Sequence, residues 1–253
     1  MITTLLFDIG GTLHTVSNSP ERRTAFAHRL ISRLAEYGID IDTPYEEFGL
    51  YLHQQGEFYK HETEGSLVEL PQPVIWNEYY LERYHIGEEK LAPIAEELSF
   101  MYDYERVCIM RRPRLKETME ELHAMGIRLG MISNIISTSF VPHALKEYGI
   151  DHLMESITMS SETGCRKPGR EIFDIARARM GGISAVETGY VGDTISRDVL
   201  GARNAELGLM IQIKNPAIAH RDAAFTGPDA PKPDYLINEL WEIPAIIREV
   251  NGR

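Results

Sequence analysis

The chain has 253 residues, of which 43% are hydrophobic and 25% are charged. This length accommodates one large domain, or a domain that carries a substantial insertion. The 38 acidic residues outnumber the 26 basic ones, giving a net charge of -12. Such a balance disfavours nonspecific binding to nucleic acid. It does not exclude binding of a small anionic ligand, because such a ligand responds to local charge.

No apolar run approaches the ~20 residues that a membrane-spanning helix needs. Met1 leads directly into an expected strand, without a basic and hydrophobic leader. We therefore expect a cytoplasmic protein with no membrane partner. The cysteines, Cys108 and Cys165, show no metal-ligand or redox spacing, so the fold is not expected to depend on disulfides.

The stretch from Leu5 to Leu13 contains the first candidate for chemistry. An apolar run typical of a parallel strand ends at Asp8 and passes into Gly10, Gly11 and Thr12, where the backbone can turn sharply. Ligands of open α/β sheets bind at the carboxyl ends of the strands, which makes Asp8 a candidate functional residue. An ordinary strand-to-turn junction would also place Asp and Gly here.

Residues 16–105 carry helical patterns throughout. Helices are expected from Pro20 to about Gly38, from Tyr45 past Tyr59, from Pro73 to near Gly87, and from Glu88 to Tyr102. The sequence therefore predicts an all-helical unit of four or five helices. Its many aromatic and methionine residues are expected to pack its own core.

From Pro113 onward, helices alternate with short apolar strands. Strands are expected at 127–132, 156–160, 189–193, 209–213 and 235–237, with helices between them and at the end. This order predicts an α/β fold with a doubly wound, mostly parallel, Rossmann-like sheet. The α/β core would comprise 1–15 plus 106–253, with 16–105 inserted as a helical cap. The long loop 214–233 would cover the site, support a subunit contact or contain a short helix.

Polar side chains follow several of these strands: Asp8, Ser133, Lys167, Asp193 and Asp198. Their expected convergence at one sheet edge indicates a ligand site. Carboxylates such as Asp8 and Asp193 are hard oxygen ligands that suit Mg²⁺. A hydroxyl and an ammonium group suit a phosphoryl group, and a carboxylate can attack phosphorus to form an aspartyl-phosphate.

Four segments together resemble the motifs of one superfamily. They are Asp8 to Leu13, Ile132 to Asn134, Arg166 to Pro168, and Gly192 to Asp198. In this order, with a helical insertion between the first and second, the chain resembles the haloacid dehalogenase superfamily in its helical-cap branch.

The resemblance implies roles for particular residues. Asp8 would be the nucleophile, with Ser133 and Lys167 as the other catalytic residues. Substrate would be bound by Thr12, Ser133, Asn134 and Lys167, and Mg²⁺ by Asp8, the Gly10 carbonyl, Asp193 and Asp198. For Asp198 three roles stay open: direct ligation of the ion, ligation through water, or orientation of Lys167.

The chain departs from the superfamily pattern at Gly10. Phosphatases of the superfamily usually have a second aspartate here, which protonates the leaving group and then activates water. Loss of a general acid–base typically removes about 10²- to 10⁴-fold in rate, which indicates a slow phosphatase. His14 has a suitable pKa range to replace it, unless it is a turn residue that faces solvent. His61 and Tyr59 are weaker candidates.

The leading hypothesis is a Mg²⁺-dependent phosphatase acting on a small phosphorylated metabolite. The first alternative is a metal-independent 2-haloacid dehalogenase-like hydrolase, because a halide leaves without a proton. The second alternative is a catalytically weak protein that binds a phosphorylated ligand. The sequence leaves the substrate and the oligomeric state open, with a homodimer among the assemblies it allows.

Overall fold

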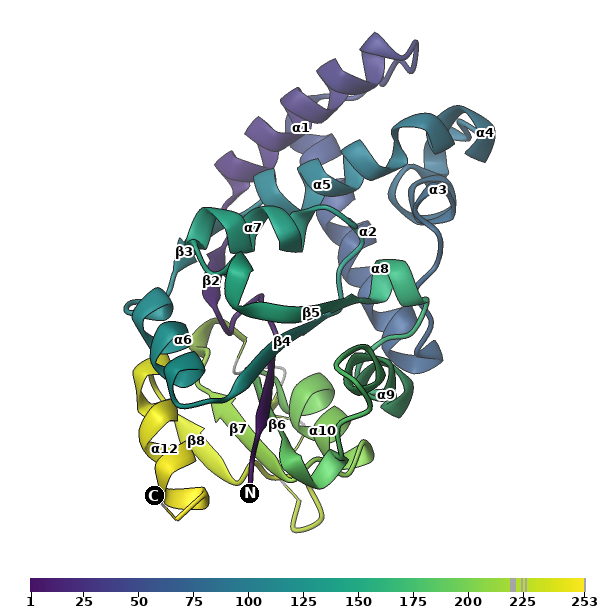
Figure 1. The fold of residues 1–253 in the computed structure, drawn as a ribbon. Helices are drawn as coiled ribbons and strands as arrows, with labels where there is room; N and C mark the ends of the chain where they lie inside the picture. Colours follow the sequence, from purple (N-terminus) through teal and green to yellow (C-terminus); the bar gives the residue numbers. More distant parts are fainter. Residues whose placement is uncertain (219–221, 224, 226, 253) are drawn as a thin grey trace.

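A six-stranded parallel sheet forms the centre of the molecule in the computed structural model (Figure 1). The structure describes residues 1–218, 222–223, 225 and 227–252. The strand order is β5-β4-β1-β6-β7-β8. The strands are β1 (Thr4–Phe7), β4 (Arg128–Ser133), β5 (Met154–Met159), β6 (Thr188–Gly192), β7 (Leu209–Ile213) and β8 (Tyr235–Ile237). The predicted α/β fold class is confirmed, and all pairings within this sheet are parallel.

Helices cover both faces of the sheet because its strands are apolar on both sides. In β1, Leu5 and Phe7 pack into one cluster with helices α6 (Leu115–Ala124), α7 (Phe140–Tyr148) and α12 (Ile243–Val250). The intervening Leu6 packs into a second cluster with α9 (Arg170–Arg179) and α10 (Leu200–Asn204). This is the burial expected of a doubly wound parallel sheet. It places the carboxyl ends of the strands at one edge between the two helix layers.

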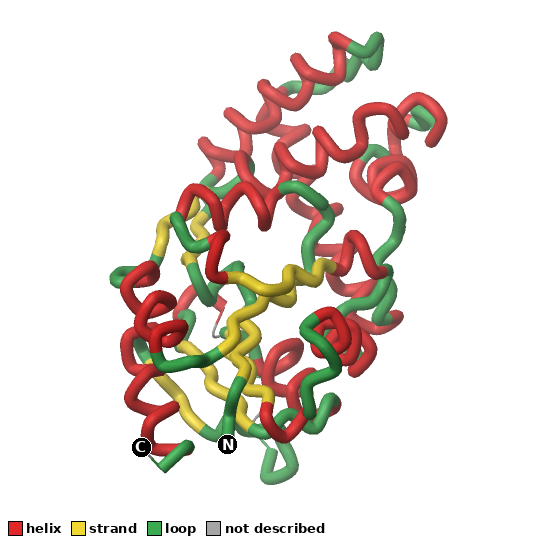
Figure 2. The backbone as a smooth tube through the Cα atoms, viewed as in Figure 1, coloured by secondary structure: helices red, strands yellow, loops and turns green. Residues whose placement is uncertain are grey.

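The segment between Ser17 and Cys108 is largely helical and has its own core (Figures 1 and 2). Its α-helices are α1 (Pro20–Glu36), α2 (Tyr45–Ser66), α3 (Gln72–Ile75), α4 (Glu88–Leu91) and α5 (Ala95–Glu105). Ser19 caps α1, accepting a hydrogen bond from the Arg22 amide, as the Ser-Pro start predicts. The helix expected from Glu88 onward is interrupted by a 3₁₀ turn, Ala92–Ile94, which contains Pro93.

A two-stranded antiparallel ribbon connects this helical segment to the sheet, and the sequence patterns did not predict it. It consists of β2 (His14–Ser17) and β3 (Cys108–Arg111). Both strands are short and have no strong alternation of apolar and polar residues, so periodicity gave no signal. β2 spans the first predicted boundary of the helical cap, between 15 and 16, and β3 begins just after the second, between 105 and 106. The domain division itself stays a prediction.

Two other predicted segments differ in detail from the observed secondary structure. The helix expected near 197–206 is divided into a π-helical turn, Ile195–Val199, and α10. Within the predicted loop 214–233 there is a 3₁₀ turn, Pro216–Ile218. Residues 219–221, 224 and 226 of that loop lie outside the described residues.

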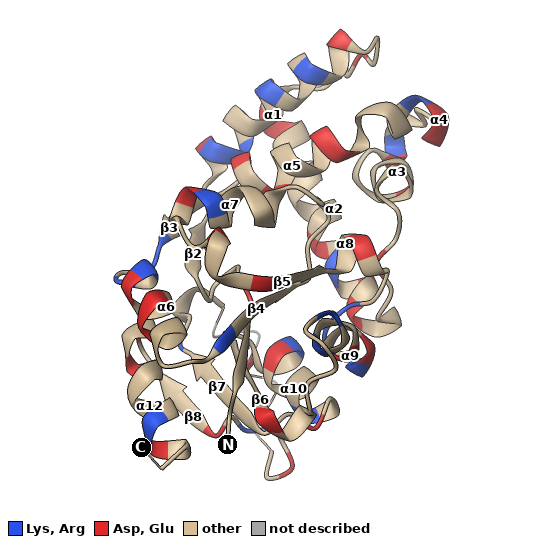
Figure 3. Cartoon of the chain, in the orientation of Figure 1, with Lys and Arg blue, Asp and Glu red and all other residues tan. Residues whose placement is uncertain are grey.

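The chain ends meet at the far end of the core from the helical segment (Figure 1). The Ile2 amide donates to Oδ1 of Asn251 at 2.7 Å, and the Asn251 side-chain amide donates to the Ile2 carbonyl at 2.8 Å. Charged residues lie mainly on helices and loops, while the strands are mostly uncharged (Figure 3). In the described part of the chain, none of the helices is long and apolar enough to cross a lipid bilayer.

Candidate active site

Three adjacent strands bring the predicted site residues together. Asp8 follows β1, Ser133 ends β4, and Asp193 follows β6, and β1 lies between β4 and β6. Their side chains line one cavity of about 670 Å³ together with Gly10 and Lys167. The position is the crevice at the carboxyl ends of the strands, where the strand order changes direction.

Lys167 connects two of the carboxylates. Its Nζ lies 2.7 Å from Oδ1 of Asp8, 2.7 Å from Oδ1 of Asp198 and 2.8 Å from the Tyr190 hydroxyl. Burial lowers the pKa of this ammonium, but the charges of Asp198 and Asp8 more than offset that effect and leave the pKa raised. Lys167 therefore stays protonated and supplies a fixed positive charge beside the candidate nucleophile.

Asn134 holds the backbone of Lys167. Its side-chain amide donates to the Lys167 carbonyl at 2.9 Å, and its Oδ1 accepts from the Lys167 amide at 2.9 Å. These reciprocal bonds fix the third motif against the end of β4. Asn134 also lines the cavity. Its observed contacts are those of a residue that positions Lys167, while the predicted contact with substrate stays a prediction.

Both oxygens of Asp198 are occupied by hydrogen bonds. Oδ1 accepts from Lys167 and from the Tyr190 hydroxyl at 3.1 Å. Oδ2 accepts from the Asp193 amide, the Thr194 amide and the Thr194 hydroxyl. Although burial opposes it, the charges of Lys167 and Arg197 hold the pKa of Asp198 below its usual range. Of the three roles left open for Asp198, these contacts support orientation of Lys167.

Asp193 has the clearest capacity for a cation. Its Oδ2 accepts a hydrogen bond from the Asn215 side chain at 2.7 Å, whereas its buried Oδ1 has no hydrogen-bond partner. Burial and the neighbouring charges of Asp198 and Asp8 raise the pKa of Asp193 to about 8. Carboxylate oxygens of these three aspartates lie within 4.8 Å of one another. Hard oxygen donors at this spacing fit a divalent cation such as Mg²⁺, which would neutralise their repulsion.

The two glycines in the turn after Asp8 have different surroundings. Gly11 has a φ of +89°, and a Cβ there would lie 1.8 Å from Oδ2 of Asp193. Gly10 has open space where a Cβ would be. The Thr12 hydroxyl donates to Oδ2 of Asp8 at 3.3 Å, so Thr12 orients the candidate nucleophile. A side chain at position 11 would therefore clash with Asp193, whereas position 10 has room for one.

The surroundings of His14 match neither of the two roles expected from the sequence, a replacement acid or a turn residue that faces solvent. Its side chain is buried rather than solvent-facing, and its Nδ1 forms a hydrogen bond of 2.8 Å with the Tyr148 hydroxyl. Burial and the nearby charge of Arg112 lower the pKa of His14 to about 4. The imidazole is thus uncharged at neutral pH and is a poor replacement for an acid. His61 is exposed and Tyr59 is bound to Glu69, and neither lines the cavity.

The opposite wall of the cavity comes from residues that the sequence analysis did not select. His53, Glu57 and Lys60 line it from α2, and Asp103 and Arg106 line it from the end of α5 and the residue after it. The spacing of the first three residues, i, i+4 and i+7, places them on one face of a helix. That spacing was a usable signal, but only the tertiary structure shows that this face meets the strand ends.

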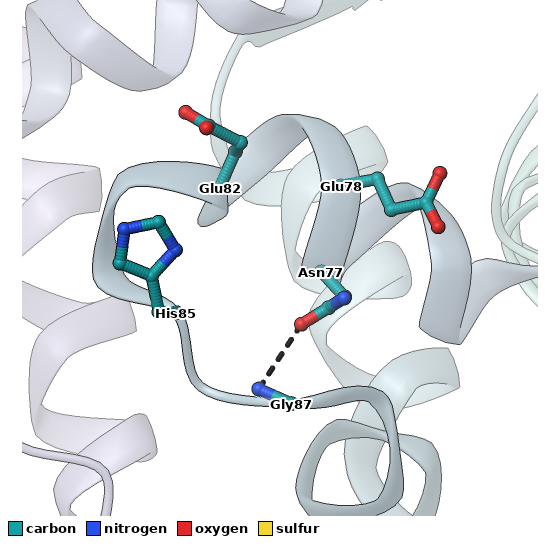
Figure 4. Close-up of a pocket in the computed structure, with 5 residues that line it drawn as sticks. All are labelled: Asn77, Glu78, Glu82, His85 and Gly87. Atoms are coloured by element: carbon teal, nitrogen blue, oxygen red, sulfur yellow. Dashed lines mark hydrogen bonds between the residues drawn. The ribbon is translucent and has the colours of Figure 1, made fainter.

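A second cavity, of about 380 Å³, lies within the helical segment (Figure 4). It is lined by Asn77, Glu78, Glu82, His85 and Gly87. The Gly87 amide donates to Oδ1 of Asn77 at 3.0 Å, which closes the turn before α4. The two glutamates disfavour a phosphorylated ligand. The chemistry predicted from the sequence belongs to the cavity at the strand ends.

Residues 2–206 match the family model described as haloacid dehalogenase-like hydrolase. The chain belongs to the haloacid dehalogenase-like hydrolase family. The matched range spans the helical segment and all four motifs. The resemblance inferred from those motifs is thereby confirmed, and so is the assignment of the chain to a family of hydrolytic enzymes.

Several relatives within this family are phosphatases by name. The chain is 26% identical to the glyceraldehyde 3-phosphate phosphatase of Methanopyrus kandleri over 99% of each chain. It is 32% identical to the enzyme of the same name from Methanocaldococcus jannaschii, over 59% of this chain and 62% of that relative, which is just under two thirds. The ribulose-1,5-bisphosphate 5-phosphatase of Halopiger xanaduensis is 25% identical over 98% of this chain and all of that protein.

Solved structures of the haloacid dehalogenase family share the fold. A 2-haloacid dehalogenase from Pseudomonas syringae superposes with a TM-score of 0.67 and 18% identity, over 99% of this chain and 100% of that one. The putative hydrolase YfnB from Bacillus subtilis, in a magnesium-bound crystal form, gives a TM-score of 0.63 at 18% identity, over 98% and 99% of the two chains. At these identities the likeness concerns the fold alone.

Proposed function

We propose that this protein is a Mg²⁺-dependent phosphatase that acts on a small phosphorylated metabolite through an aspartyl-phosphate. The observation that carries the proposal is the arrangement around Asp8. Lys167 lies 2.7 Å from this carboxylate, and a buried oxygen of Asp193 in the same cluster has no hydrogen-bond partner. The phosphatase names of the relatives support the same reaction class.

In the first proposed step, a carboxylate oxygen of Asp8 attacks phosphorus, and the bond from phosphorus to the ester oxygen breaks. The leaving oxygen departs as an anion and is protonated by water afterwards, because Gly10 offers no acid. In the second step, water attacks the aspartyl-phosphate, which releases inorganic phosphate and restores Asp8. The Lys167 ammonium offsets the negative charge that accumulates on the phosphoryl oxygens.

The cation would be held by Asp8, the Gly10 carbonyl and Asp193, with Asp198 behind them orienting Lys167. When bound, Mg²⁺ would neutralise charge on the phosphoryl group and lessen its repulsion from the aspartates. Residues 16–105 would act as a cap that excludes water from the site and contacts the leaving group, as the wall formed by α2 and α5 suggests.

The absence of an acid at Gly10 predicts a strong dependence on the leaving group. For a series of aryl phosphates, we expect rates to fall steeply as the pKa of the phenol rises, because the departing oxygen must leave as an anion. A flat dependence would reveal an acid elsewhere in the site. Aryl phosphates also allow the test without knowledge of the natural substrate.

The deciding experiment compares wild type with Asp8→Asn and wild type with chelator, measuring release of phosphate from a panel of phosphorylated metabolites. Both changes should abolish turnover. Release of chloride from 2-chloropropionate in the presence of chelator would instead establish the dehalogenase alternative. Mg²⁺-dependent binding of phosphorylated compounds without any product would establish the alternative of a binding protein. The cytoplasmic location and a homodimeric assembly are further predictions, tested by fractionation and by light scattering.

A further inference from the structure

Arg106 is a residue of the cavity wall whose hydrogen bonding is incomplete. It follows α5 directly and lines the same cavity as Asp8 and Lys167. Its Nε is buried and has no hydrogen-bond partner, although the charges of Asp103 and Glu57 act on the guanidinium and help to raise its pKa. Burying a cationic donor without a partner costs free energy, so this side chain is suited to receive a ligand.

The guanidinium of Arg106 is nevertheless held in place. Its central carbon lies 4.2 Å from the centroid of the Tyr102 ring, a cation–π contact. Tyr102 is buried, with its ring 4.5 Å from that of Tyr80 and 6.2 Å from that of Trp76. The aromatic core of the helical segment therefore fixes the position of the charge before any ligand binds. Preorganisation of this kind reduces the entropy lost on binding.

The acidic groups on the same wall already have partners. Glu57 accepts a hydrogen bond from Lys60 at 2.7 Å. Oδ2 of Asp103 accepts one from the Ser137 amide at 2.9 Å. Burial raises the pKa of Asp103 to about 7, while the Ser137 amide and the charge of Arg106 oppose the rise.

The opposite wall holds the groups that would react with a phosphoryl group. Lys167 donates hydrogen bonds to Asp8 and Asp198, so its positive charge lies at the strand ends and not at the wall formed by the helical segment. A cavity of about 670 Å³ has room for a small metabolite that contacts both walls. Such a metabolite would place its phosphoryl group at Asp8 and its other end near the helical segment.

We propose that Arg106 binds a second anionic group, a carboxylate or a phosphate, at the end of the substrate remote from the phosphoryl group transferred to Asp8. The proposal rests on the proposed phosphatase function and narrows its substrate class to phosphorylated acids and bisphosphates. The unpaired Nδ1 of His53, buried on the same wall, is a further hydrogen-bonding group for the intervening hydroxyls.

The test uses three phosphorylated metabolites that differ in the group at the end remote from one phosphate. 3-Phosphoglycerate ends in a carboxylate and glyceraldehyde 3-phosphate in an uncharged aldehyde, while ribulose 1,5-bisphosphate supplies a second phosphate. We expect kcat/KM of wild type for at least one of the two substrates with an anionic end to exceed kcat/KM for the aldehyde by about 10- to 100-fold, the range of a charge-assisted hydrogen bond. The comparison between carboxylate and bisphosphate identifies which anion is used.

Arg106→Gln should remove this preference, mainly through KM, because kcat/KM for the substrates with an anionic end falls about 10-fold or more relative to kcat/KM for the aldehyde. Arg106→Lys should keep part of the preference, because it keeps the charge. Arg83→Gln is the matched control: Arg83 also stacks on a tyrosine, at 4.0 Å from the Tyr51 ring centroid, but does not line the cavity. It should behave as wild type. Thermal unfolding of all variants establishes that they fold.

Two results would overturn the proposal. One is a wild type that prefers the aldehyde to both anionic substrates. The other is an Arg106→Gln variant that is folded and loses activity equally on all three. If no substrate is hydrolysed, the phosphatase function fails separately, and calorimetric titration of Asp8→Asn with 3-phosphoglycerate still decides the inference. Binding must then weaken about 10-fold or more when Arg106→Gln is added.

Discussion

Glu69 and Arg166 form an ion pair whose side chains are only 1% and 5% exposed, and it joins the helical segment to the core one residue before Lys167. Glu69 also accepts hydrogen bonds from the Tyr59 and Ser160 hydroxyls. The chain around it is bound as well: the Glu69 amide donates to the Gly164 carbonyl at 2.8 Å. The third motif is therefore anchored to the chain that follows α2, as well as to β4.

The first prediction concerns this pair. Glu69→Gln should lower the free energy of unfolding by about 3 to 5 kcal/mol, because it leaves the buried Arg166 charge uncompensated. Urea unfolding followed by circular dichroism measures the change. Glu155→Gln provides the control, since its pair with Arg128 is 41% exposed on both sides and should contribute about 0 to 1 kcal/mol. Equal effects of the two substitutions would contradict the structure.

The second prediction concerns the missing acid. Gly10→Asp should raise the phosphatase rate by about 10²- to 10⁴-fold and flatten the dependence on the leaving group, because the rest of the site is in place and a Cβ at Gly10 meets open space. Steady-state kinetics with aryl phosphates of rising phenol pKa measure both effects. Gly11→Ala is the matched control and should abolish activity, since its Cβ would overlap Asp193. An unchanged rate in Gly10→Asp would mean that another group already supplies the proton.

The third prediction concerns the cation. Addition of Mg²⁺ should raise the Tm of wild type, because an ion that binds the folded state alone stabilises it by mass action. Asp193→Asn should lose this increase, because it removes the carboxylate whose Oδ1 is free of hydrogen bonds. Thermal unfolding with and without Mg²⁺ measures the effect independently of activity. A full Mg²⁺ response in the variant would place the ion elsewhere.

The fourth prediction concerns Asp103. Burial raises its pKa to about 7, with Glu69 adding to the rise, while the Ser137 amide, Arg106 and Lys60 oppose it. Its pKa in the unfolded chain is near the ordinary 3.8. The unfolded state therefore releases this proton first, and the carboxyl increasingly destabilises the folded protein as pH rises from about 3.8 to about 7.

Asp103→Asn removes this titration and keeps an oxygen for the Ser137 amide. The variant should match wild type near pH 4 and become more stable than wild type toward pH 7, by up to about 4 kcal/mol, with no further gain above that pH. Chemical unfolding of both proteins across this range measures the difference. A stability difference independent of pH would contradict the raised pKa. Asp40→Asn, at an exposed aspartate, is the control for the same change of net charge.

The sequence by itself determined the parallel α/β architecture, because apolar strands and amphipathic helices alternate and short crossovers have one hand. It also placed Asp8, Ser133 and Asp193 at strand ends, where parallel strands bring them to one edge. The sequence also shows that position 10, two residues after Asp8, carries glycine where phosphatases of the superfamily usually have an aspartate. These are local properties of the chain, read from spacing and residue type.

Only the tertiary structure decided the rest, because those features depend on contacts between residues distant in sequence. His14 is buried and hydrogen-bonded to Tyr148, which disfavours the charged form that an acid needs, although its position in the sequence suggested that role. The engagement of Asp198 by Lys167 arises where two turns of the core meet at the strand ends. The position of Arg106 in the same cavity as Asp8 arises from packing of the helical segment against the core. Tertiary packing determines how deeply a side chain is buried and how many hydrogen bonds and ion pairs a charged group forms. The periodicity of the sequence does not determine either.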